Sequence, residues 1–135
     1  MTNFPYKLTQ NIHWADMDAY EHINNAVFFR YFEDVRMHVL EEIGANDYMT
    51  QHNLGPILAR TEADYRAPLI YPDTIDIKAA VTDIQDKKFT MLYQVYSHKL
   101  QTIACEGKAL IVYYDYNQNK SCAIPDVLKQ ALINN

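Results

Sequence analysis

The sequence predicts an α+β protein in which a curved antiparallel sheet of about five strands wraps around one long helix. Three observations lead to this prediction. Apolar residues recur at helical spacing without interruption over residues 25–43. Four segments with the alternation of β-strands follow in close succession, separated by short polar turns. One helix and one sheet must bury each other's apolar faces, and a sheet that curls around the helix buries both.

The composition fits one globular domain. The chain has 135 residues, the usual size of a domain, and 49% of them are hydrophobic, so we expect a single domain over residues 1–135. Charged residues make up 21%, an ordinary share, which excludes a disordered chain. The formal net charge is −5 and the sequence has no basic stripe, so we expect no binding to nucleic acid.

Sequence signals for membranes, secretion and metals are missing. The longest apolar run, residues 109–114, is too short to cross a bilayer, and residues 1–8 lack the charged and apolar regions of a signal peptide. The two cysteines, Cys105 and Cys122, fit free thiols in a reducing compartment, and no Cys or His spacing resembles a zinc site. We therefore expect a cytoplasmic protein with no membrane insertion, no metal and no other cofactor.

Residues 4–14 are predicted to form the first strand, because their apolar side chains alternate along one face. That face carries Tyr6, Leu8, Ile12 and Trp14. A polar turn over residues 15–24 then leads to the helix.

The long helix is predicted over residues 25–43, with Asn24 as its N-cap. Residues 26–32 contain a single charge, which indicates a helix surrounded by protein on nearly all sides. Gly44 stands where a left-handed residue commonly ends a helix. Residues 46–53 are expected to form a loop or a short second helix.

Four further strands are predicted, over residues 57–66, 74–82, 89–96 and 102–115. Gly107 lies inside the last strand and predicts a bulge or the close approach of another backbone. Pro125 favours the start of a short C-terminal helix over residues 126–133. The second faces of the strands carry apolar side chains such as Leu92 and Leu110, which predicts a further buried surface and hence a homodimer or homotetramer.

The polar turn before the helix concentrates reactive groups. Asp16, Asp18, His22, Asn24 and Asn25 lie within ten residues, immediately before a helix start. Helix starts present unpaired N–H groups and a partial positive charge, which suit a catalytic site for a reaction that develops negative charge. From these residues alone, an aspartate here is more often a cap than a catalytic group, so both alternatives stay open. Asp16 is expected to shape the turn.

The order of elements and the run Asp16-x-Asp18…His22-x-Asn24-Asn25 resemble the hotdog-fold acyl-CoA thioesterases, and more narrowly the 4-hydroxybenzoyl-CoA thioesterase-like family. The resemblance covers about residues 6–115, is most specific over residues 14–36 and is supported by residues 59–73. It implies a hotdog fold and the hydrolysis of an acyl-CoA to the free acid and CoA. Coenzyme A would then be part of the substrate and not a cofactor.

The resemblance also assigns roles at the polar turn. It implies that Asp18 is the catalytic carboxylate, acting as general base or as nucleophile, and that the backbone N–H of Asn25 binds the oxyanion. His22 is either a catalytic or substrate-binding group or a histidine that only shapes the turn. Members of the family commonly carry glycine where this chain has Glu21, so Glu21 either changes the turn or adds a second acid near the site.

Residues outside the turn are expected to bind the substrate. Thr61 lies on the inward face of its strand, which passes close to the thioester in related enzymes. Lys87 and Lys88 occupy a turn that in the family is often basic and helps to hold the nucleotide end of CoA; a solvated turn is the alternative. Arg60 and Arg66 are further candidates for the phosphates.

A hotdog dehydratase or hydratase is a less favoured alternative to the thioesterase. Hotdog dehydratases and hydratases usually depend on a histidine within a motif that this chain lacks. A non-catalytic protein that binds acyl thioesters remains an alternative, as does a thioesterase acting on acyl-carrier protein. Free acyl-CoA is the preferred substrate, because carrier proteins are usually acidic and this chain is acidic too. The acyl group is not specified.

Overall fold

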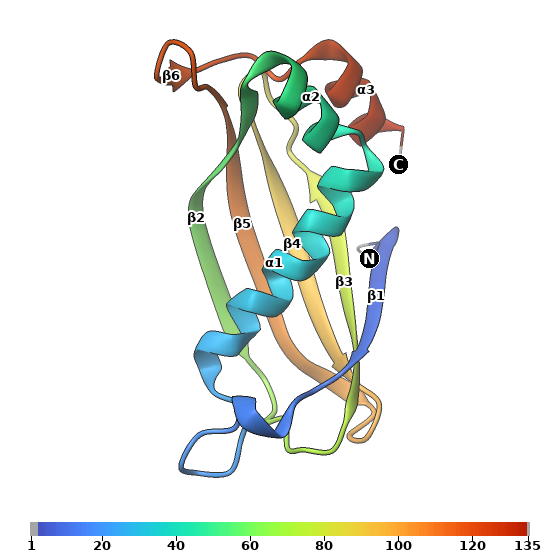
Figure 1. Cartoon of the computed structure of the whole chain (residues 1–135). Coiled ribbons are helices and arrows are strands. Elements are labelled where there is room, and N and C mark those ends of the chain that lie inside the picture. Colours follow the sequence, from blue (N-terminus) through green and yellow to red (C-terminus); the bar gives the residue numbers. More distant parts are fainter. Residues whose placement is uncertain (1–2, 135) are drawn as a thin grey trace.

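The computed structural model describes residues 3–134 as one antiparallel sheet curled around a long helix (Figure 1). The helix, α1 (Asn25–Glu42), lies along the concave face of the sheet. The strands are β1 (Tyr6–Asn11), β2 (Leu54–Tyr65), β3 (Thr74–Thr82), β4 (Lys88–Ser97), β5 (Thr102–Asp115) and β6 (Lys120–Ser121). Their order is β1-β3-β4-β5-β2, and β6 pairs with β5. The predicted α+β class and the hotdog arrangement are confirmed.

The ends of α1 follow the predicted capping residues. The side chain of Asn24 accepts a hydrogen bond from the N–H of Ala26 at 3.0 Å, so Asn24 caps the helix start. Gly44 has a φ of +83°, the left-handed conformation that ends α1 and allows α2 (Ala45–His52) to begin at once. Segment 46–53, predicted as a loop or a helix, is therefore largely helical.

The centre of the core is an aromatic stack between helix and sheet. Phe32 of α1 is fully buried and lies on Tyr93 of β4, with ring centroids 4.7 Å apart and nearly parallel planes. Gly107 of β5 lies against the same ring, because a Cβ there would be 2.4 Å from two carbons of Phe32. The prediction of a bulge or a neighbouring backbone at Gly107 was wrong: the glycine makes room for an aromatic side chain.

The first strand is shorter than predicted. β1 ends at Asn11, whose partner Thr74 is the first residue of β3, so the chain has no strand to pair with beyond that point. Residues 14–16 instead form a short 3₁₀ helix, and Trp14 is 70% exposed, not part of the buried face.

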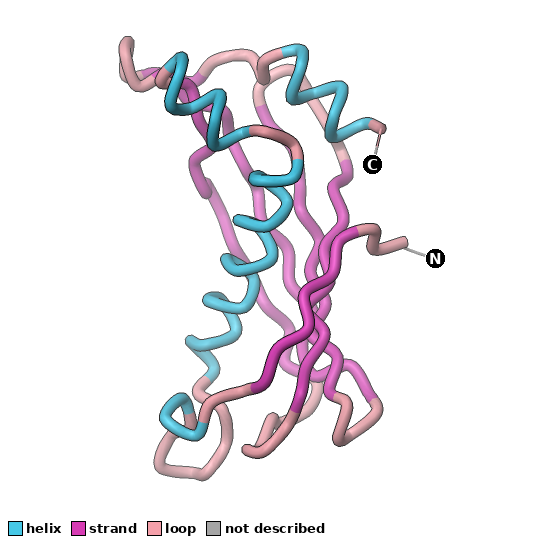
Figure 2. Tube along the Cα trace, turned by 45° about the vertical axis from the view of Figure 1, so that its right-hand side comes forward, coloured by secondary structure: helices cyan, strands magenta, loops and turns pink. Residues whose placement is uncertain are grey.

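The two ends of the molecule differ (Figures 1 and 2). Segments 12–24, 66–73 and 98–101 meet at one end, where α1 begins; this end is at the bottom of Figure 1. At the other end α2 and α3 (Asp126–Ile133) lie near the start of β4. The polar turn of the sequence is therefore at one tip of the molecule, beside the end of β2.

Candidate active site

The polar turn is a closed loop tied to its neighbours by backbone hydrogen bonds. Met17 and Ile23 form an isolated antiparallel bridge, and the N–H of Asp18 donates to the carbonyl of His22 at 2.8 Å. The N–H of Ile23 donates to the carbonyl of Leu69 at 2.8 Å. These bonds fix the backbone of Asp18 against segment 66–73 and give its carboxylate a defined position.

The carboxylate of Asp18 is half-buried and held by one oxygen. Its Oδ1 accepts hydrogen bonds from the N–H of Tyr20 at 2.9 Å and the N–H of His22 at 3.5 Å. Its Oδ2 accepts no hydrogen bond from residues 3–134. A purely structural cap needs only the first oxygen, so the second is available to a water molecule or a substrate.

The start of α1 provides a backbone donor close to this carboxylate. Capping by Asn24 uses the N–H groups of Ala26, through the side chain, and of Val27, through the carbonyl. The N–H of Asn25 comes first in the helix and has no acceptor in the described part of the chain. It is therefore an available donor at the positive end of the helix dipole.

One cavity of about 330 Å³ joins these groups. It is lined by Asp18, His22, Ile23, Asn25, Phe28, Tyr65, Arg66, Ala67 and Pro68. The fold thus brings together the three residues predicted to be catalytic, and segment 65–68 closes the cavity on the other side. Their chemical roles stay predictions.

Tyr65 is a site residue to which the sequence interpretation gave no role. Its hydroxyl donates to the carbonyl of Asn25 at 3.1 Å, and its ring meets Phe28 edge-on with centroids 5.4 Å apart. It therefore holds the backbone of Asn25 from its carbonyl side, and the available N–H belongs to the same residue. The only sequence signal was its place on the inward face at the end of a strand.

Of the predicted substrate-binding residues, only Arg66 lines this cavity, and its guanidinium is paired with the carboxylate of Glu106 at 3.0 Å. Thr61, Lys87, Lys88 and Arg60 are not among the lining residues. Thr61 is exposed on β2, on the same face as Tyr65 and about 13 Å along the strand from it, at 3.3 Å per residue. Lys87 and Lys88 lie at the start of β4, whereas the cavity is near its end, roughly 30 Å away along a ten-residue strand. Within one chain these three residues do not meet Asp18, and their roles stay predictions.

Comparison with known proteins identifies the family. A family model described as the thioesterase-like superfamily matches residues 12–132. This chain belongs to the thioesterase-like superfamily. The family membership confirms the resemblance noted in the sequence and the class of enzyme, a thioester hydrolase.

Individual relatives of this superfamily member are distant in sequence and close in fold. It is 22% identical to the long-chain acyl-CoA thioesterase FadM of Escherichia coli over 116 residues, or 86% of this chain and 88% of that protein. The PA2801 protein, a putative thioesterase from Pseudomonas aeruginosa, superposes with a TM-score of 0.85 at 22% identity, covering 96% and 99% of the two chains. A thioesterase from Thermus thermophilus complexed with coenzyme A and Zn gives 0.84 at 22% identity, covering 96% and 98%.

Glu21, which departs from the pattern of the thioesterase family, adopts a left-handed backbone conformation in the turn. Its φ is +63°, the left-handed region that glycine adopts most easily, which gives a physical reason for glycine at this position. The N–H of Glu21 donates to the carbonyl of Asp18 at 3.0 Å, and its side chain is exposed and does not line the cavity. Glu21 therefore does not add a second acid to the lining of the cavity, and its effect on the turn stays a prediction.

Asp16 connects the turn to the helix of this thioesterase. Its Oδ1 lies 3.4 Å from a guanidinium nitrogen of Arg30, and its carbonyl accepts the N–H of Asn24 at 3.0 Å. Both contacts fix the backbone where the chain enters α1. They agree with the predicted role of Asp16 in shaping the turn.

Thiol chemistry and metal binding have little support from the side chains. Burial above all, and then the charges of Asp64 and Glu106, raise the pKa of Cys105 to about 12, so this thiol stays protonated at neutral pH. Cys105 and Cys122 are both free. Among residues 3–134 no three His, Cys, Asp or Glu side chains are arranged to hold a metal ion, and no helix is long and apolar enough to span a membrane.

Proposed function

We propose that this chain hydrolyses an acyl-CoA thioester to the free acid and CoA. The observation that carries the proposal is that an open carboxylate oxygen of Asp18 and the available N–H of Asn25 belong to residues that line the same cavity. Similarity to FadM, a long-chain acyl-CoA thioesterase, and to a thioesterase complexed with coenzyme A supports acyl-CoA as the substrate.

The chemistry requires stabilisation of an oxyanion and activation of a nucleophile. The thioester carbonyl oxygen accepts a hydrogen bond from the N–H of Asn25, and the dipole of α1 stabilises the negative charge that develops there. The carboxylate of Asp18 either takes a proton from an attacking water or attacks the carbonyl carbon itself, giving an anhydride that water then opens. In both routes the C–S bond breaks and the thiolate of CoA leaves.

We assign His22 the task of giving a proton to the leaving thiolate. Its side chain lines the cavity and has no hydrogen-bond partner among residues 3–134. Its backbone already holds Asp18 through two hydrogen bonds, and these do not depend on the imidazole. Replacing His22 with alanine therefore separates the two alternatives: a turn histidine predicts normal turnover, and a proton donor predicts slower turnover.

We further propose that the functional unit is a homodimer or a homotetramer built on β2. Among residues 3–134 this strand pairs only with β5, and eleven of its twelve residues are not buried, including Leu58 at 42% exposure. A long unpaired edge is a template for another strand, and a second copy paired antiparallel along β2 would cover it. Equilibrium sedimentation tests the assembly, and a monomer at working concentrations contradicts it.

The same arrangement gives Lys87 and Lys88 a route to the substrate. Antiparallel pairing of two β2 strands places the start of β4 in one copy at the end of the molecule where the other copy holds Asp18. Two lysines so placed would meet the phosphates of CoA bound to the partner. Thr61, which is exposed on β2, would lie near the contact between the copies.

The reducing compartment proposed for this protein is the cytoplasm. Both cysteines are free thiols in the structure, which supports a reducing environment. Cell fractionation tests the location, and recovery of the protein outside the cytoplasmic fraction contradicts it.

A thiol-release assay tests the activity. Purified protein is mixed with acyl-CoAs from short to long chain, a few aryl-CoAs and matching acyl-carrier proteins, and free thiol is followed by a chromogenic reagent. We expect release from at least one class of acyl-CoA. Tight binding of acyl-CoA without thiol release favours the alternative of a binding protein, and release from acyl-carrier protein alone favours the other alternative.

A further inference from the structure

A second cavity lies at the same end of the molecule and is larger, about 720 Å³. It is formed by residues 11–14, the turn at 71–74 and residues 98–99, and shares no lining residue with the cavity of Asp18. Segment 66–74 connects the two, because its first residues line the Asp18 cavity and its last residues line the second one. None of the roles assigned so far uses this cavity.

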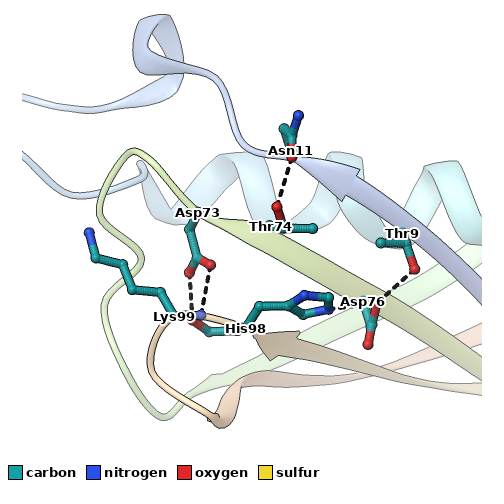
Figure 3. A network of polar contacts seen from close by, with 8 residues as sticks. Thr9, Asn11, Asp73, Thr74, Asp76, His98 and Lys99 are labelled. Atoms are coloured by element: carbon teal, nitrogen blue, oxygen red, sulfur yellow. Dashed lines mark hydrogen bonds and ion pairs between the residues drawn. The ribbon is translucent and has the colours of Figure 1, made fainter.

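Several residues that line the second cavity form a network of hydrogen bonds (Figure 3). The carboxylate of Asp73 accepts hydrogen bonds from the Oγ of Ser97 and from the backbone N–H of Lys99, the latter at 3.0 Å. The N–H of His98 donates to the carbonyl of Thr74 at 2.9 Å. Ser97 is fully buried, so its bond to Asp73 is partly shielded from water, and the three bonds together hold the two turns against each other.

The acidic groups of this network are already engaged. The two oxygens of Asp73 have the donors just described, and the Oδ1 of Asp76 accepts from Thr9 at 2.7 Å and lies 3.0 Å from the Nε2 of His98. The Lys99 side chain extends away from Asp73 in Figure 3 and has no carboxylate partner within residues 3–134. The cavity therefore offers a free ammonium group in a chain whose net charge is −5.

Aromatic side chains provide the other half of the site. Trp14 is 70% exposed and Tyr71 is 44% exposed, and both line the cavity. Proteins commonly bind nucleotides with exposed aromatic rings that stack on the base and with cations that bind the phosphates. Trp14, Tyr71 and Lys99 are groups of these two kinds. His13, next to Trp14, also lines the cavity, and its imidazole adds a hydrogen-bonding group.

We propose that this cavity binds a phosphorylated adenine nucleotide, with the base on Trp14 and Tyr71 and a phosphate on Lys99. Two sources have this chemistry: the nucleotide end of the bound acyl-CoA, whose arm would cross segment 66–74, and a separate nucleotide. The first source rests on the proposed function, and in that case Lys99 would replace Lys87 and Lys88 as the partner of the CoA phosphates. The second source does not depend on the proposed function.

Trp14 makes the test direct, because it is the only tryptophan of the chain. Adenosine 3′,5′-bisphosphate is titrated into the full chain while tryptophan fluorescence is followed, and calorimetry checks the affinity. We expect saturable quenching. Lys99→Gln is expected to weaken binding about tenfold, the size of one lost charge-assisted contact. Lys120→Gln, at the other end of the molecule, is the matched control and is expected to leave binding unchanged.

The Michaelis constants for acyl-CoA and acyl-pantetheine, which lacks the nucleotide, separate the two sources. If Lys99→Gln raises the Michaelis constant for acyl-CoA but not that for acyl-pantetheine, the site binds the nucleotide of the substrate itself. If both Michaelis constants are unchanged while binding of the bisphosphate is weakened, the site binds a separate nucleotide. Absence of saturable binding, or equal binding by the Lys99 and Lys120 variants, overturns the proposal. Since the titration needs no hydrolysis, an inactive protein would contradict the proposed function and not this site.

Discussion

Removal of the Tyr65 hydroxyl tests whether the helix start is held for catalysis. In Tyr65→Phe the ring stays against Phe28 and only the hydrogen bond to the carbonyl of Asn25, 3.1 Å long, is lost. Tyr65 is 46% exposed, so water can replace the hydrogen bond in part, and the net contribution of the bond is about 0.5–1.5 kcal/mol. If the bond serves to position the N–H of Asn25 in the transition state, that free energy corresponds to a fall in kcat of about two- to tenfold.

Steady-state kinetics with acyl-CoA measure the effect, and thermal unfolding is recorded alongside. Because Tyr65 acts on the donor and not on the bound substrate, kcat is expected to fall while KM changes little. Tyr116→Phe is the matched control, since Tyr116 lies at the other end of the molecule and its hydroxyl has no hydrogen bond within residues 3–134. Unchanged kcat in Tyr65→Phe, or an equal loss in both variants, would refute the positioning role.

Three further predictions concern the fold and its pH dependence. Gly107→Ala forces a methyl group to 2.4 Å from the buried ring of Phe32 and is expected to destabilise by about 1–3 kcal/mol in urea unfolding; the loss should shrink in a Phe32→Leu background. Glu21→Gly relieves a left-handed backbone and is expected to raise stability by up to about 1 kcal/mol in thermal unfolding, with activity retained; a loss of stability would contradict this. Burial alone would raise the pKa of Asp76, but hydrogen bonds from Thr9 and His98 and nearby positive charge hold it below its usual value. Its contribution to stability is therefore present above about pH 4 and is lost as the pH falls further, so acid unfolding curves of Asp76→Asn should be less steep there than those of the wild type.

The fold could be predicted because its elements are encoded locally. Helical spacing and a capping asparagine defined 25–43, and α1 extends over Asn25–Glu42. The last long strand was predicted over 102–115 and is found at Thr102–Asp115. The prediction failed at Trp14, because the end of β1 is set by where its partner β3 begins, a pairing between segments some sixty residues apart. The short strand β6 was missed for a similar reason, since two residues carry no pattern.

The candidate site could be predicted only in part for the same physical reason. Asp18, His22 and Asn25 are neighbours in sequence, so their position at a helix start could be inferred from the chain alone. Tyr65 comes from the end of β2, and its contact with Asn25 depends on the order of the sheet and on the path of α1 across it. Sequence periodicity places a side chain on a face of a strand, but it does not say which helix end that face meets.

The central claim is that the Asp18 carboxylate carries the hydrolysis, and turnover of Asp18→Asn tests it most directly. Asparagine keeps an oxygen that can accept the N–H groups of Tyr20 and His22, so the loop and the melting temperature are expected to be retained. It cannot act as a base or a nucleophile, and kcat for the best acyl-CoA is expected to fall by about 10²–10⁴. A folded variant that releases thiol within about twofold of the wild-type rate, well below the effect of losing a catalytic group, would contradict the account.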